Sequence, residues 1–506
     1  MPNGEPDDYL WIVIVGGFLA VFTAYGIGAN DVANAFSTSV GAKTLTLKQA
    51  VILGGIFEFL GAFLFGSHVT KTIRKGIADV ECFVDDGEML MYGMMCVIFV
   101  TGVWLLLATV LELPVSTTHS TIGGIIGMTM AAKGSSCVIW KTDTDQFPYV
   151  KGVAAVVISW ILSPLFSAIV AAIFFLTTRA TVLRHPDAYK RALLSYPIFV
   201  GCTLVIYIFF IIYKGAKGLE LADTPLDVAL GCSFGIGFGI GILMIPTFIP
   251  WLRKKIDNTD FTAKEVEVAE IEAGGEEKDT KPDSKTPPMS TPQTSASGEG
   301  LFKHDTHESL KTDQKVMDLH ENSEKFDEKA EAVFKSMQVF TACCDAFGHG
   351  ANDVANSIGP YAAIYTIYSN NAVSKKNELG ADAYWILALG AIGIVIGLAT
   401  YGYKIMAAMG VKMTPITPSR GFCIEMGATF VIILGSRLEM PLSTTHCQVG
   451  ATMGVGSLEG CGQLNWTLLL KVFGGWLVTL LVVGFSAAVV FAQGAYAPCI
   501  FTDPGN

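Results

Sequence analysis

Two identical stretches combine a carboxylate with amide side chains inside apolar surroundings. Gly-Ala-Asn-Asp-Val-Ala-Asn occupies residues 28–34 and returns unchanged at residues 350–356. On a helix, residues three or four positions apart share one face. A carboxylate within an apolar segment is costly unless a cation compensates it, and such oxygen ligands suit sodium. The candidate sodium ligands are Asp31 and Asn34 in the first copy and Asp353 and Asn356 in the second.

The alternative for these motifs is structural. The asparagine side chains would then cap broken helices, and each aspartate would pair with a lysine. Because the motif occurs twice in equivalent surroundings, we favour the cation site.

A second doubled motif supplies hydroxyl groups. Pro-Val-Ser-Thr-Thr-His at residues 114–119 is echoed by Pro-Leu-Ser-Thr-Thr-His at residues 441–446. Proline ends the incoming helix, and the hydroxyls follow at the next helix N-terminus, where free amide groups and the helix dipole attract an anion. Phosphate fits such a site, and sulfate fits almost as well; simple N-capping is the alternative. The candidate anion ligands are Ser116, Thr117, Thr118, Ser443, Thr444 and Thr445.

Four further ionisable residues are candidates for function. His119 and His446 directly follow the hydroxyls. Either could donate to the anion or sense its protonation, and a packing role is about as plausible. Glu58 and Glu425 lie inside apolar runs, where a carboxylate is a candidate for cation coupling or gating.

The two motifs keep their order and nearly their spacing. The Asp-Asn motif recurs at an offset of 322 (353 minus 31) and the Ser-Thr-Thr motif at 327 (443 minus 116). The chain therefore reads as two copies of one half. We expect each half to contain a broken helix at the first motif and a re-entrant helical hairpin that turns at the second.

The composition indicates a membrane protein. Of 506 residues, 51% are hydrophobic and 16% charged, and apolar runs near 20 residues recur. The prediction is an all-α polytopic membrane protein in a lipid bilayer, with no nucleic-acid partner. Spans are expected at residues 9–27, 49–69, 151–177, 193–213, 228–251, 384–406 and 468–490, and hairpins at 89–132 and 421–455.

Three segments follow from this pattern. Residues 9–251 form a first transmembrane repeat with additional spans, and residues 333–493 form the second repeat. Between them, residues 256–330 are rich in Glu, Lys, Ser, Thr and Pro, which predicts a disordered hydrophilic linker. Basic residues at 179–191 and 253–255 place their loops and the linker in the cytoplasm. The N-terminus then lies outside, and the two halves are inverted, with their hairpin tips meeting near the bilayer midplane.

The cysteines show no zinc-type spacing. We expect most of the eleven to be small core residues within helices. The opening of the first hairpin should bring the loops that contain Cys82 and Cys137 onto one face.

These doubled motifs and the long central linker resemble the inorganic phosphate transporter (PiT) family, particularly its eukaryotic sodium-coupled members. The resemblance implies a plasma-membrane symporter with both termini extracellular, which imports phosphate with sodium by alternating access around a midplane site. It implies no cofactor beyond sodium as the coupling ion. It also assigns Asn30 and Asn352 to phosphate and ties Glu58 and Glu425 to transport.

Several alternatives stay open. The coupling ion could be a proton, and the anion could be sulfate or arsenate. An intramembrane phosphohydrolase would use His119 and His446 with the acids around a metal, but the sequence contains no HExxH motif and no nucleophile elbow. We therefore do not expect an enzyme. A phosphate sensor without transport is a weaker reading, and the sequence leaves a homodimer open.

Overall fold

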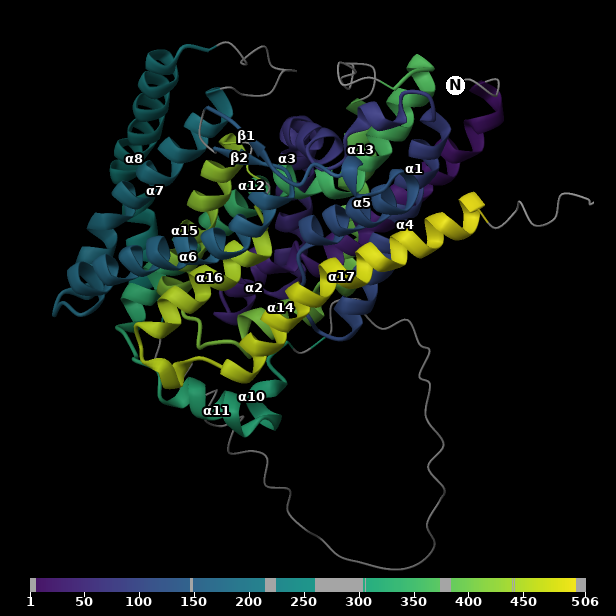
Figure 1. The fold of residues 1–506 in the computed structure, drawn as a ribbon. Coiled ribbons are helices and arrows are strands. Elements are labelled where there is room, and N and C mark those ends of the chain that lie inside the picture. Colours follow the sequence, from purple (N-terminus) through teal and green to yellow (C-terminus); the bar gives the residue numbers. More distant parts are fainter. Residues whose placement is uncertain are drawn as a thin grey trace, which may run out of the picture.

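The structure is a computed structural model that describes residues 6–145, 149–213, 224–259, 304, 306–373, 384–438, 440 and 442–496. It is a bundle of long helices that cross one another at an angle (Figure 1). The first part of the chain contains α1 (Leu10–Asn30), α2 (Ala33–Gly41), α3 (Leu47–Lys75), α4 (Gly87–Val110), α5 (Thr117–Lys133), α6 (Val153–Thr178), α7 (Ala188–Ile212) and α8 (Leu226–Asp257). The two short strands β1 (Thr142–Asp143) and β2 (Val150–Lys151) pair antiparallel between α5 and α6.

The second part contains α10 (Ser309–Thr312), α11 (Gln314–Glu321), α12 (Glu328–Asn370), α13 (Tyr384–Tyr401), α14 (Tyr403–Gly410), α15 (Pro418–Arg437), α16 (Thr444–Ser457) and α17 (Trp466–Tyr496). Short 3-10 turns occupy Pro6–Tyr9, Val80–Phe83, Ser135–Cys137 and Cys461–Gln463, and a π-helical turn at Arg179–Leu183 follows α6. Nine helical segments of the described chain are long and apolar enough to cross a membrane. The predicted all-α membrane protein is therefore confirmed.

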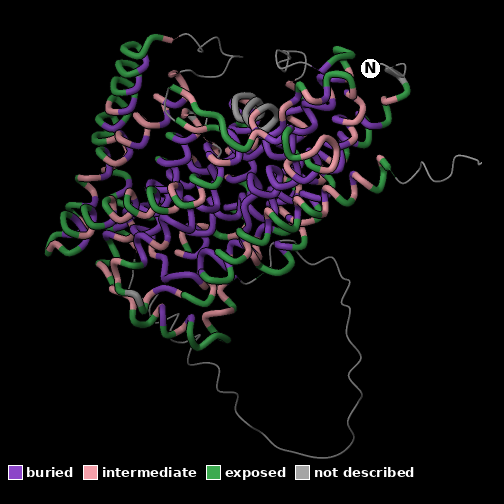
Figure 2. The backbone as a smooth tube through the Cα atoms, viewed as in Figure 1, coloured by how far each residue is buried: buried purple, intermediate pink, exposed green. Residues whose placement is uncertain are grey.

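Buried residues fill the middle of the bundle, and exposed residues line its outer helices (Figure 2). Many of the exposed residues are large and apolar, such as Phe18 on α1, Ile242 on α8 and Phe485 on α17. In water such surfaces would be unfavourable, but in a bilayer they face hydrocarbon.

Both predicted hairpins are present. In the first, α4 ends at Val110 and α5 begins at Thr117, with Pro114 in the turn. In the second, α15 ends at Arg437 and α16 begins at Thr444; Pro441 lies outside the described residues. The tips touch, since the Thr118 hydroxyl donates to the carbonyl of Leu442 at 3.4 Å. The inverted arrangement of the two halves and their place in the bilayer stay predictions.

The Asp-Asn motif breaks only one of its two helices. Between α1 and α2, the amides of Asp31 and Val32 both donate to Ile27 O, and the helix restarts at Ala33. In the second half, the prediction of a break at Asn352 and Asp353 is wrong, because α12 runs continuously through the motif. The residue one turn earlier differs: α12 has His349, whereas the equivalent position in α1 (349 minus 322) is Ile27. α12 therefore has a side-chain partner for its aspartate in the preceding turn, since His349 Nε2 lies 2.8 Å from Asp353 Oδ2, whereas Ile27 offers none in α1.

The prediction that residues 256–330 are disordered is wrong for part of this segment. Helix α8 extends to Asp257, α10 and α11 lie at residues 309–321, and α12 begins at Glu328. Apolar side chains explain this: Val316 and Leu319 are buried against the helical body. Residues 260–303 and 305 lie outside the described part.

A disulfide closes the opening of the first hairpin. Cys82, before α4, is bonded to Cys137, after α5, so the two loops do lie on one face as predicted. The sequence does not predict the pairing itself, because most of the scattered cysteines are expected to be core residues. The bond joins positions 55 residues apart.

Glycines let helix backbones approach each other closely. A Cβ atom at Gly397 of α13 would lie 1.9 Å from the carbonyl oxygen of Tyr25 on α1, and one at Gly61 of α3 would lie 2.0 Å from Phe347 O on α12. Such small-residue contacts are the usual basis of helix packing in membranes.

Substitution of Gly397 by Ala should force α1 and α13 apart, because the added methyl group meets backbone that cannot rotate away. We expect a loss of about 1–3 kcal/mol, the usual range for overpacking, seen as a lower midpoint of thermal unfolding in detergent. Gly239 on α8 is the matched control, since nothing lies within 4 Å of its added Cβ. Equal midpoints for both alanine variants would contradict the packing argument.

Candidate functional site

The two hairpin tips share one local geometry. Ser116 and Ser443 are N-cap residues of α5 and α16, with extended backbone, and their side chains accept hydrogen bonds from the amides of His119 (3.2 Å) and His446 (3.3 Å). This is ordinary N-capping. The caps fix the first helical turns, so that the following threonines point toward the middle of the protein.

Asn30 holds the turn of the first hairpin. Its Nδ2 donates to Thr109 Oγ1 and to the carbonyl of Leu113, both at 3.0 Å, and its Oδ1 accepts from the amide of Val115 at 3.0 Å. Both amide atoms are therefore engaged with the turn. Asn352 is less constrained: it donates to Asp353 at 3.1 Å and accepts from Ser436 at 3.4 Å. The assignment of both residues to phosphate stays a prediction.

Asp31 lies where the two tips meet. Its Oδ2 accepts from Thr117 of the first hairpin at 2.8 Å. Its Oδ1 accepts from Thr445 of the second hairpin and from Asn34 Nδ2, the latter at 2.9 Å. One carboxylate thus joins α1, α2 and both hairpins. It is 1% exposed, so no bulk water replaces these contacts.

Asp353 is the second carboxylate of this centre. Its Oδ2 accepts from Thr444 at 2.6 Å, and its Oδ1 accepts from Asn356 at 3.1 Å. Asn356 also donates across to the first hairpin, to Thr117 at 2.9 Å and to Thr118 at 3.2 Å. The structure therefore brings together the predicted sodium ligands of both halves and the predicted anion hydroxyls of both tips.

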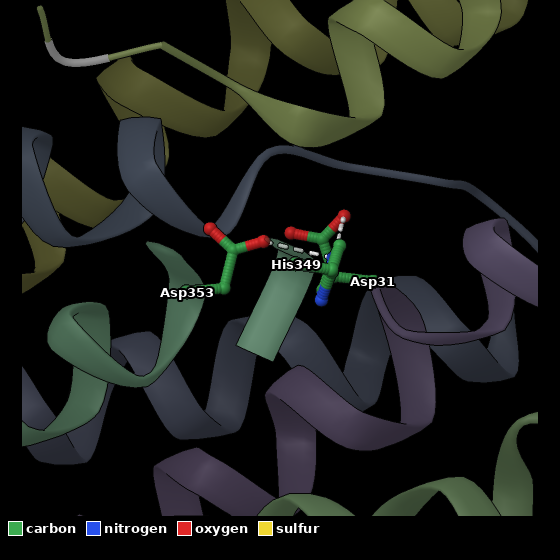
Figure 3. A group of neighbouring side chains, drawn as sticks. All are labelled: Asp31, His349 and Asp353. Atoms are coloured by element: carbon green, nitrogen blue, oxygen red, sulfur yellow. Dashed lines mark ion pairs between the residues drawn. The ribbon is translucent and has the colours of Figure 1, made fainter. Parts of the chain in front are cut away.

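His349 lies between the two aspartates (Figure 3). Its Nε2 is 2.8 Å from Asp353 Oδ2 and 3.8 Å from Asp31 Oδ1, and its Nδ1 is 3.1 Å from Glu58 Oε1. The imidazole thus contacts three buried carboxylates. Among the described residues, it is the basic side chain that contacts all three.

Sequence reasoning missed His349. It precedes the second motif by one residue and Asp353 by four, so a helical wheel would have placed it on the same face. Asp345, one further turn back, was also missed; it is buried and accepts from Thr429 at 2.5 Å. Both residues lack repeat equivalents, since Thr23 and Ile27 stand at these positions of the first half. A search guided by repeat symmetry passes over them.

Two amide oxygens at the centre have no hydrogen-bond donor. These are Asn34 Oδ1 and Asn356 Oδ1, both buried, one from each half. A buried acceptor without a donor costs about 1–3 kcal/mol. A bound cation removes this cost. Together with the carboxylates, these oxygens form a set of ligands that fits sodium.

Glu58 and Glu425 have different surroundings. Glu58 joins the centre through His349. Glu425 lies instead among hydroxyl groups: Oε1 accepts from Thr38 at 2.5 Å and from Ser39 at 3.2 Å on α2, and Oε2 accepts from Thr341 on α12. It therefore couples the short helix after the first motif to α12 and α15, at a separate place from the two aspartates.

The two histidines lie behind the tips. The rings of His119 and His446 meet edge to face at 4.5 Å, with Trp160 5.0 Å from the first and Trp476 stacked at 3.6 Å on the second. All four ring nitrogens lack hydrogen-bond partners. The two histidines are therefore part of a packed aromatic cluster. Their role in sensing the anion stays a prediction.

A closed, buried polar centre inside a helical membrane body is typical of membrane transport proteins. Residues 27–487 match the phosphate transporter family. The chain is 35% identical to a putative phosphate permease of Pyrococcus abyssi (96% of this chain, 98% of that one) and 32% identical to the phosphate-repressible phosphate permease of Neurospora crassa (97% and 98%).

Sodium appears in the names of other relatives. The sodium-dependent phosphate transporter 1 of Rattus norvegicus is 28% identical, over 96% of this chain and 95% of its own length. A solved structure titled "The sodium-dependent phosphate transporter" superposes with a TM-score of 0.73 at 30% identity, over 97% of this chain and 99% of that one. The chain belongs to the phosphate transporter family, as its doubled motifs predicted.

Replacement of Asn30 by Ala should destabilise the protein even without phosphate, because it removes three hydrogen bonds from the hairpin turn. We expect a loss of about 2–3 kcal/mol, at roughly 1 kcal/mol for each bond, measured by thermal unfolding in phosphate-free buffer. Asn352→Ala serves as the control, and its effect should be smaller. If Asn30 acts on phosphate alone, its variant will unfold at the wild-type temperature in that buffer.

Proposed function

We propose that this protein is a sodium-coupled phosphate symporter. One observation carries the proposal: the hydroxyls that suit an anion are hydrogen-bonded to the carboxylates that suit a cation. The same donors cannot serve Asp31 or Asp353 and an incoming phosphate at once. Occupancy of the carboxylates therefore controls the availability of the anion site.

Sodium binding supplies the first step. With Asp31 and Asp353 ionised, the centre repels a phosphate anion, and its threonine donors are occupied. A sodium ion at each Asp-Asn pair would neutralise one carboxylate and use the free Oδ1 of Asn34 or Asn356. The hydroxyls of Thr117, Thr444 and Thr445 would then be free to rotate toward an anion.

Phosphate binding follows from this release. The hydroxyls begin α5 and α16, so the positive ends of two helix dipoles also face the site. No lysine or arginine of the described residues contacts Asp31 or Asp353 in this centre. The charge that attracts phosphate would therefore come from the co-transported sodium ions, and uptake of each would then depend on the other.

Transport requires that the centre open to each side in turn. In this structure the site is closed: Asp31, Asp353 and the three threonines are at most 2% exposed. Contacts between the halves, such as Asn356 with Thr117, close it. We propose alternating access, in which the hairpin tips separate toward one face and then the other.

The disulfide supports an orientation of the protein in the membrane. Disulfides persist in oxidising surroundings, so the Cys82–Cys137 bond supports an extracellular face for the first hairpin opening. Figure 1 shows the N-terminus on the same side as β1 and β2, and α10 and α11 at the opposite end. We propose a plasma-membrane protein with extracellular termini and a cytoplasmic linker.

Proton coupling is the second candidate. His349 contacts three carboxylates and could move a proton among them. Uptake driven by a proton gradient without sodium would favour it. Sulfate and arsenate are the competing anions, and competition with labelled phosphate in proteoliposomes separates them. The relatives are permeases, so no enzymatic activity is proposed.

Asp31→Asn and Asp353→Asn should each raise the sodium concentration for half-maximal uptake by about tenfold, because a buried charge is lost while an oxygen ligand remains. The measurement is labelled phosphate uptake into proteoliposomes over a range of sodium concentrations. Asp85→Asn, in an exposed loop, is the control. Wild-type sodium activation in both site variants would exclude these aspartates as sodium ligands.

Thr117→Val and Thr444→Val should raise the phosphate concentration for half-maximal uptake by about tenfold or more, since each removes a donor to a charged group without changing the volume. Uptake at saturating sodium measures this effect. Thr129→Val, on the same helix as Thr117 and without a partner for its hydroxyl, is the control. An unchanged phosphate requirement would leave these hydroxyls with a purely structural role.

A further inference from the structure

The last part of the central linker is docked on the body of the protein. We call residues 306–327 the strap; they contain α10 and α11. Its apolar residues Val316 and Leu319 are buried, and Phe326 packs edge to face on Phe175 of α6 at 6.5 Å. A charged, hydrophilic segment that buries such side chains is an ordered part of the molecule.

The strap holds the ends of two short helices. His307 Nε2 donates to the carbonyl of Gly41, the last residue of α2, at 3.2 Å. His320 Nε2 donates to the carbonyl of Val411, the C-cap of α14, at 3.0 Å. Both bonds satisfy carbonyls that a helix end leaves free. The two helix ends also touch, because a Cβ atom at Gly41 would lie 2.0 Å from Gly410 O.

The strap also joins the opening of the second hairpin. Arg420, near the start of α15, is bound to Glu459, just after α16, at 2.6 Å. The strap adds to this pair: the Glu324 amide donates to Glu459 at 3.2 Å, and Arg420 donates to the Glu324 carbonyl at 2.6 Å. The side chain of Glu324 accepts two hydrogen bonds from Arg184, at 2.7 and 2.9 Å. This contact holds the pKa of Glu324 below its usual value, so the pair is ionic at neutral pH.

These contacts cross the two halves of the protein. Gly41 and Arg184 belong to the first half, whereas Val411, Arg420 and Glu459 belong to the second. Any movement of one half against the other on this face must stretch or break them.

Helix α2 connects the strap to the site. It starts at Ala33, just after the break at Asp31, and ends at Gly41, so its nine residues span about 13 Å. Asn34 at one end belongs to the cation centre, and Thr38 in the middle contacts Glu425. A fixed end at Gly41 therefore limits how far α2 can move away from α14 and α15.

We propose that the strap is an autoinhibitory clamp that keeps the cytoplasmic side of the site closed and must detach for the site to open inward. This inference rests on the proposed transport function. The clamp lowers the transport rate by stabilising a closed state, and release of the strap raises the rate without changing the ligands at the site.

The test uses the Glu324–Arg184 pair in the full-length protein. Glu324→Lys and Arg184→Glu should each release the strap, and the double exchange should restore it in part, because Arg179 also lies 3.8 Å from the Glu324 carboxylate. A reporter cysteine, Ala42→Cys at the end of α2, is labelled with a membrane-impermeant maleimide from the strap side. We expect each single variant to raise both the labelling rate and the initial phosphate uptake rate about threefold, and the double variant to return both toward wild type.

Glu321→Lys is the matched control, since it makes the same charge change at an exposed position of α11. It should change neither rate. Faster labelling with unchanged or lower uptake in the single variants would overturn the clamp. Unchanged labelling in the single variants would also overturn it, because the strap would then not cover α2. Absence of uptake in the wild-type protein would instead count against the transport function, while the labelling would still report on the strap.

Discussion

The structure depends on two carboxylates, Asp31 and Asp353, that are buried in one small centre. Ionised carboxylates in a low-dielectric interior are costly unless compensated. Here the compensation comes from His349 and from threonine hydroxyls of both hairpin tips. Because these partners come from helices of both halves, the need to stabilise two charges draws the halves together. The same contacts leave both aspartates at most 1% exposed, and in the proposed mechanism sodium ions would replace them.

The two copies of the Asp-Asn motif show how context changes the same residues. In the first copy the helix opens, and Asp31 turns to donors on both hairpins. In the second copy α12 stays intact, and His349 supplies a partner from the preceding turn. The seven residues are identical, so the difference comes from outside the motif, where His349 stands at the position equivalent to Ile27. The repeated sequence thus gives two aspartates that face one centre but have different partners, so the two proposed sodium sites would differ in affinity.

Much of the fold and of the site could be predicted from the sequence. Apolar run lengths gave the spans, prolines gave the hairpin turns, and the doubled motifs selected the residues that meet. The remainder depended on contacts between distant segments. His349 and Asp345 have no repeat equivalents, and the Cys82–Cys137 pair depends on how two loops fold back. The docked strap was missed because its few apolar residues, Val316 and Leu319, are diluted by charged neighbours. Composition averages over a segment, whereas docking needs only a few contacts.

The two hairpin openings are fastened by bonds of different kinds. A covalent disulfide joins the loops that flank the first hairpin. The second is held by the Arg420–Glu459 pair and by hydrogen bonds to the strap, all of which can break and reform. A covalent link fixes the loops of one opening, while an ionic and hydrogen-bonded link allows the other to respond to charge. If transport requires both faces to open, the first face must open by movement of its hairpin as a rigid unit, whereas the second can open by release of a segment. The transport rate can therefore be controlled most readily at the face with the strap, because no covalent bond has to break there.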